Sequence, residues 1–83
     1  MPTVDWINGL RVVIYPNDHL PIHVHVIGNG CEAIIKLHSS DGKLEVRENY
    51  GFSEKELKAI KNALTPKRAQ LIHQWSIIHD NRK

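Results

Sequence analysis

Short runs of β-branched and other apolar residues dominate the first half of the chain. The run LRVVIY, residues 10–15, stops at Pro16, which cannot continue a central strand. The runs IHVHVI, residues 22–27, and CEAIIKLH, residues 31–38, alternate apolar with polar positions. KLEVRE, residues 43–48, follows the turn-forming sequence SSDG. These patterns predict a small antiparallel sheet of three to five strands.

The Asn29-Gly30 dipeptide between two of these runs is the strongest hairpin signal in the chain, because both residues tolerate positive φ. If these two residues form the loop, alternation along the strands gives one wholly apolar face. The opposite face then collects His23, His25, Glu32, Ile34 and Lys36. We therefore expect His23 and His25 to point the same way, outward from the core.

The neighbouring strands are expected to extend this polar face. Arg11 and Tyr15 join it from the first strand, and Arg47 joins it from the last. Leu44 and Val46 lie at the alternate positions of the last strand and are expected in the core.

The last third of the chain has the pattern of amphipathic helices. Ser53 and Glu56 form a capping box, with Phe52 and Leu57 as a hydrophobic staple. Thr65-Pro66 predicts the start of a second helix, since proline is favoured at the first helical position. The buried face of this helix is expected to contain Leu71, Ile72, Trp75 and Ile78.

These elements together predict an α+β fold. The sheet is followed by two C-terminal helices packed on one face. We expect a single domain over residues 1–83, β-rich over 1–50 and helical over 53–80.

Composition narrows the function classes only slightly. The chain has 83 residues, 41% hydrophobic and 24% charged, and a net charge of +2, which is too weakly basic to indicate nucleic-acid binding by itself. The single cysteine, Cys31, is typical of a reducing compartment. The N-terminal residues lack the pattern of a signal peptide and no apolar run is long enough to span a bilayer. We expect a cytoplasmic protein that does not bind membranes.

The histidine-rich stretch NDHLPIHVHV, residues 17–26, is the main candidate for chemistry. Imidazoles act as acid or base near neutral pH, and cations stabilise the charge that develops on a phosphate during RNA cleavage. The candidate catalytic residues are Asp18, His19, His23 and His25. The candidate binding residues are Arg11, Tyr15, Asn17, Glu32, Lys36, Arg47 and Tyr50.

A metal site is an alternative use of the same residues. The H-x-H pair of His23 and His25 is a genuine ligand arrangement, and Asp18, His19 or Glu32 could supply a third ligand for a divalent metal. Only two ligands have well-defined geometry, so we expect no cofactor and no metal.

The motif N-D-H-x-P-x-H-x-H, the segment GNGCEA and the sequence RENYGFS together resemble a family of small bacterial proteins known as domain of unknown function 4160. The resemblance covers nearly the whole chain. It implies a short, soluble protein with no reaction assigned by the family, often encoded beside a second small protein in a toxin–antitoxin-type pair. The signature positions are Asn17, Asp18, His19, Pro21, His23, His25, Glu32, Asn49, Tyr50 and Gly51.

The resemblance and the residues lead to one functional hypothesis with two alternatives. The hypothesis is a toxin-like component that acts on or binds RNA through the histidine-bearing sheet face, with a small cognate protein as partner. The first alternative is a non-catalytic, antitoxin-like binding module. The second is a metal-dependent enzyme that uses His23 and His25. Whether the protein is an enzyme or a homo-oligomer stays open.

Overall fold

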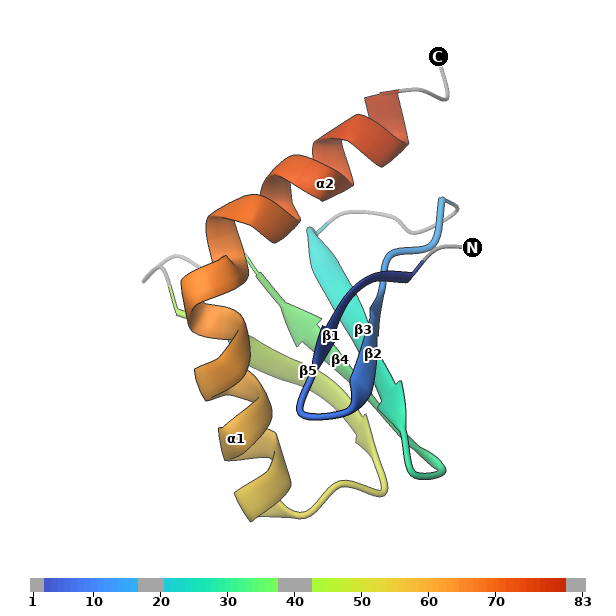
Figure 1. The fold of residues 1–83 in the computed structure, drawn as a ribbon. Helices are drawn as coiled ribbons and strands as arrows, with labels where there is room; N and C mark the ends of the chain where they lie inside the picture. The colour runs from blue at the N-terminus through green and yellow to red at the C-terminus, as the bar shows by residue number, and fades with distance from the viewer. Residues whose placement is uncertain (1–2, 17–20, 38–42, 81–83) are drawn as a thin grey trace.

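The computed structural model describes residues 3–16, 21–37 and 43–80, with the side chain of Asp80 left out. It contains a five-stranded antiparallel sheet followed by a helical segment (Figure 1). The strands are β1 (Thr3–Ile7), β2 (Leu10–Val13), β3 (His23–Gly28), β4 (Cys31–Lys36) and β5 (Glu45–Tyr50). Their order in the sheet is the order of the sequence, so β1 and β5 are the edge strands.

Two tight turns of the same chemistry connect four of the five strands in pairs. Asn29 and Gly30 have φ of 53° and 75° and join β3 to β4, as the Asn-Gly signal predicts. Asn8 and Gly9 have φ of 49° and 78° and join β1 to β2 in the same way. The strand β1 was not among the predicted strands, although Asn8-Gly9 carries the same signal that predicts the other hairpin.

The pairing of β3 with β4 has the predicted register. His23 lies opposite Lys36, His25 opposite Ile34 and Ile27 opposite Glu32. The alternate positions of these strands are fully buried and belong to the core: Val24, Val26, Ala33 and Ile35. The separation of an apolar face from a histidine-bearing face is therefore confirmed.

The helical segment begins at the predicted capping box. Ser53 accepts a hydrogen bond from the Glu56 backbone N–H, and the Glu56 side chain accepts one from the Ser53 N–H. The elements α1 (Glu54–Leu64), η1 (Thr65–Lys67) and α2 (Arg68–Asp80) then follow without a loop.

The expected pair of separate helices is therefore wrong, because the chain forms one continuous helical segment. Thr65 and Arg68 keep right-handed helical dihedrals, so the backbone does not leave the helical path between α1 and α2. Pro66 lacks a backbone N–H and tightens the turn into a 3-10 helix without ending the segment. The helix changes direction at η1 (Figure 1).

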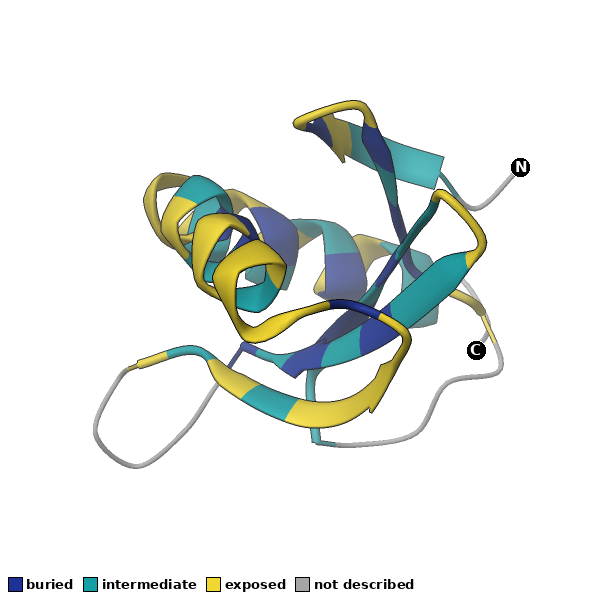
Figure 2. Ribbon diagram, turned by 90° about the horizontal axis from the view of Figure 1, so that it is seen from below, coloured by how far each residue is buried: buried dark blue, intermediate teal, exposed yellow. Residues whose placement is uncertain are grey.

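The core lies between the apolar sheet face and the helical segment, and the sheet curves around α1 in Figure 2. Leu44 and Val46 are half-buried and pack against this core, as expected. From α1 and α2 the core receives Ile60, Leu64, Leu71 and Trp75. No helix in the described ranges is long and apolar enough to cross a membrane.

An ion pair between Asp5 of β1 and Lys67 of η1, 2.8 Å long, ties the edge of the sheet to the helical bend. The hydrogen bond from Lys67 holds the pKa of Asp5 below its ordinary value of 3.8, and the Trp6 N–H lowers it further. Because the folded state prefers the ionised carboxylate, this contribution to stability is present above that value and is lost as the pH falls below it.

We expect Asp5→Asn to lower the free energy of unfolding by about 0.5 kcal/mol at neutral pH, the range of partly exposed ion pairs. The difference from the unsubstituted protein should shrink to nothing toward pH 2. Urea denaturation across pH, followed by circular dichroism, measures this. A difference that persists in acid would show that Asp5 contributes through something other than its charge.

Candidate functional site

Five aromatic and imidazole rings form a continuous row from the sheet to α2. Tyr15 meets His25 edge-on with ring centroids 4.8 Å apart, and His25 meets His23 at 5.3 Å. His23 lies 5.1 Å from Trp75, which stacks on His79 at 4.0 Å and 18°. The row connects the strand-borne histidines to the helix that crosses the end of the sheet.

His23 forms the buried centre of this row. Only 5% of the residue is exposed, and its Nδ1 lies 2.7 Å from the carbonyl oxygen of Pro21. Since a carbonyl only accepts, Nδ1 carries the proton in this bond. The expectation that His23 faces outward is wrong, because Trp75 of α2 covers it. The alternation along the strand predicts the side of the sheet on which His23 lies. It does not predict that Trp75 of α2 packs over that side chain.

His25 is paired with a carboxylate. Its Nδ1 lies 2.8 Å from Oε2 of Glu32, and the two side chains are 12% and 39% exposed. Glu32 therefore orients the imidazole and is the more accessible member of the pair. Val13, directly opposite His25 on β2, is fully buried. The face is therefore largely closed to solvent at these two positions.

The histidine face is the sheet face that carries His23 and His25, opposite to the face covered by α1. Partners directly opposite one another in adjacent strands lie on the same face. The pairing therefore sets one row across all five strands: Trp6, Arg11, Ile27, Glu32 and Tyr50. Arg11 donates from Nε and Nη2 to the Thr3 hydroxyl at 3.2 and 3.0 Å. Trp6 and Tyr50, at the two edges, are 59% and 58% exposed.

An irregularity in β5 changes which charges join this face. The register shifts between Ile34 and Ile35, so that Ile34 lies opposite Glu48 rather than Arg47. A bulge of this kind adds one unpaired residue to a strand. Arg47 is skipped in this pairing and Glu48 takes the position opposite Ile34, so the place of Arg47 on the histidine face stays a prediction.

The surroundings of Tyr50 are consequently negative. The charge of Glu48 raises the pKa of the Tyr50 hydroxyl above 10.0, and desolvation, a hydrogen bond to Glu48 and the charge of Glu32 add to this effect. Each carboxylate disfavours the phenolate.

The structure brings together some of the predicted site residues. His23, His25, Glu32, Tyr15 and the half-buried Lys36 lie on the histidine face with Arg11 and Tyr50. Asn17, Asp18 and His19 lie outside the described residues. Within the described ranges, no group of three His, Cys, Asp or Glu side chains is placed to hold a metal ion.

A family model, the domain of unknown function DUF4160, matches residues 9–76. The chain belongs to this family. No curated protein and no solved structure matches the chain significantly. The match spans all of β2 to β5 and α1, and therefore includes the histidine face except for its β1 edge.

Two parts of the ring row and its surroundings were not identified as site residues from the sequence. Trp6 lies beside the Asn8-Gly9 turn, so recognition of the β1–β2 hairpin would have placed it on an edge strand. Trp75 was expected in the core, and it is buried there, but its contact with His23 joins positions far apart in sequence. No local signal reports such a contact.

We expect His23→Ala to destabilise the fold by about 3 kcal/mol, because it removes a buried ring from between Trp75 and His25. His73→Ala on the exposed side of α2 is the matched control and should cost less than about 0.5 kcal/mol. Urea denaturation of both variants measures the difference. Equal stability of the two variants would contradict a structural role for His23.

Proposed function

We propose that the protein is one component of a toxin–antitoxin-type pair and that it binds a small cognate protein through the histidine face. The observation that carries this proposal is the distribution of exposure on that face. Its histidines lie inside a packed ring row, whereas its two most exposed large hydrophobic side chains, Trp6 and Tyr50, stand at its two edges.

Exposed aromatic side chains are typical anchors of protein interfaces. Tryptophan, tyrosine and arginine supply most of the residues whose truncation costs a complex much of its binding energy. The row across the sheet begins with Trp6, continues with the fixed guanidinium of Arg11 and ends with Tyr50. Ile27, half-buried between them, adds apolar surface at the centre. This composition suits a protein partner.

The charges on the face favour a partner with basic side chains. Near Tyr50 the carboxylates of Glu32 and Glu48 produce the negative potential that raises the tyrosine pKa. RNA binding depends on cations that neutralise phosphates, and the same carboxylates repel phosphates. A protein surface with lysine or arginine beside an apolar patch complements both features.

We expect the double substitution Trp6→Ala and Tyr50→Ala to weaken binding of the protein encoded by the adjacent gene by more than about thirtyfold, since a single anchor of this kind contributes roughly 2 kcal/mol. Isothermal titration calorimetry with the purified neighbour measures the affinity. Ile77→Ala is the matched control, because Ile77 is an exposed apolar residue on α2.

The control should change the affinity less than about twofold, as expected for an apolar residue outside the interface. Full affinity of the double variant would place the interface elsewhere. A neighbour that does not bind the unsubstituted chain would contradict the pair itself.

RNA cleavage by a toxin-like protein is a second candidate function, favoured by the bond between His25 and Glu32. A carboxylate that accepts from one imidazole nitrogen fixes the tautomer and the orientation of the ring. Glu32 is accessible enough to take a proton from a ribose hydroxyl itself, with Arg11 two positions along the row to meet a phosphate.

If this second function holds, expression of the chain arrests growth and the purified protein cleaves RNA. Glu32→Gln should then reduce the cleavage rate by about a hundredfold, as loss of a general base does. Glu48→Gln serves as the control. It also removes one carboxylate from the histidine face, but at the position opposite Ile34 rather than at Glu32. If expression of the chain does not slow growth and the purified protein does not cleave RNA, the cleavage function is contradicted and only the binding function remains.

A further inference from the structure

A groove separates β5 from α1 on the helix side of the sheet. Two adjoining cavities form it, of about 250 and 310 Å³, and Lys61 borders both. The first is lined by Lys43, Leu44, Lys61, Thr65 and Arg68, and the second by Val46, Glu54, Leu57, Lys58 and Lys61. We call this the β5–α1 groove.

The helical segment is bound to the sheet at β1 and after β4, and these contacts leave a groove between α1 and β5. Lys67 binds Asp5 at the β1 edge, and Arg68 donates from Nε to the Leu37 carbonyl at 2.7 Å, after the end of β4. Ile60 and Leu64 fill the core from α1. β5 pairs with β4 on one side, and in the described part of the chain no strand pairs with its other side.

The lining combines an apolar floor with a basic rim. Leu44, Val46 and Leu57 are half-buried, and their side chains pack against the core. The rim carries one acid, Glu54, and the cations of Lys43, Lys58, Lys61 and Arg68. A ligand that fits such a lining has apolar groups for the floor and several negative charges for the rim.

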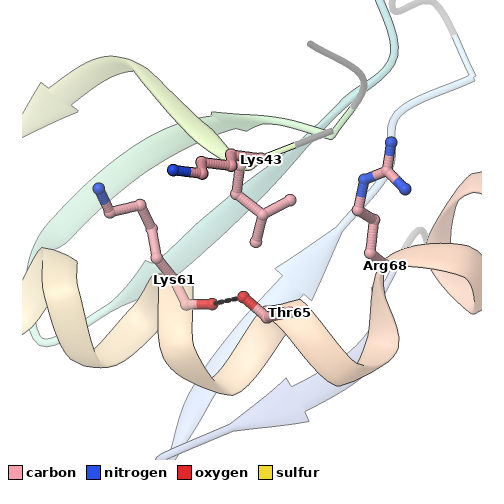
Figure 3. Close-up of a pocket in the computed structure, with 5 residues that line it drawn as sticks. Lys43, Lys61, Thr65 and Arg68 are labelled. Carbon is pink, nitrogen blue, oxygen red and sulfur yellow. Dashed lines mark hydrogen bonds between the residues drawn. The ribbon is translucent and has the colours of Figure 1, made fainter. Parts of the chain in front are cut away.

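The cations are distributed along the groove rather than gathered at one point. In Figure 3 the ammonium groups of Lys43 and Lys61 extend toward one end of the first cavity, and the guanidinium of Arg68 lies toward the other. Arg68 is held by its bond to Leu37, and Thr65 donates its hydroxyl to the Lys61 carbonyl at 2.7 Å. An elongated ligand with charges at intervals matches this distribution better than a single small anion.

We propose that the β5–α1 groove binds an extended acidic segment of a partner protein as an added strand beside β5. Addition of a strand to an exposed sheet edge uses main-chain hydrogen bonds for affinity and alternate side chains for specificity. Alternate apolar side chains of the segment would contact Leu44, Val46 and Leu57. Its carboxylates would face the lysines of the rim and Arg68.

The lining favours a peptide over a nucleic acid. Single-stranded nucleic acids are bound largely by stacking of bases on aromatic rings, and every apolar residue that lines the two cavities is aliphatic. The groove lies on the other side of the sheet from the histidine face and contains none of its residues. The proposal therefore goes beyond the proposed function and stands without it.

The test uses the full chain and a fluorescein-labelled octapeptide of alternating glutamate and valine, with binding followed by fluorescence anisotropy. We expect saturable binding that Lys61→Glu and Lys58→Glu each weaken at least tenfold. Lys55→Glu is the matched control, because Lys55 is exposed on α1 and borders neither cavity. This variant should stay within twofold of the unsubstituted protein.

Further probes distinguish the alternatives. Hydrogen exchange should slow at the amides of Glu45–Tyr50 when the peptide binds, and not at those of β1. Binding without protection of β5 would overturn the added strand. An octapeptide of alternating lysine and valine should not bind. A labelled oligouridylate that binds with the same dependence on Lys61, while the acidic peptide does not, would overturn the proposal in favour of nucleic acid.

Discussion

The Asn29-Gly30 turn is the constraint on which the arrangement of the sheet depends. Both residues adopt positive φ, which allows a loop of only two residues. A two-residue loop fixes the register of β3 against β4. A slip of one residue would exchange the apolar face for the histidine face along both strands. The core, the pairing of His25 with Glu32 and the position of His23 under Trp75 all follow from this one register.

Local chemistry determines how much of this molecule can be predicted from sequence. The hairpin register, the two faces and the capping box at Ser53 were predictable, because each depends on neighbouring residues. The packing of Trp75 against His23 and the bulge in β5 could not be predicted, since both arise from contacts between distant segments. The continuity of the helix through Pro66 also escaped prediction, because the same proline is compatible with a helix start and with a bend.

The two surfaces of the sheet have opposite character. The histidine face is aromatic at its edges and negative around Tyr50, while the β5–α1 groove is aliphatic at its floor and positive at its rim. A small protein of this family thus offers two chemically distinct surfaces on one thin sheet.

The bend at η1 is fixed at two adjacent residues, Lys67 through Asp5 and Arg68 through the Leu37 carbonyl. α1 and α2 extend from this point in different directions as two arms of one rod (Figure 1). α1, which borders the β5–α1 groove, and α2, which places Trp75 against His23, therefore share one anchored point on the sheet.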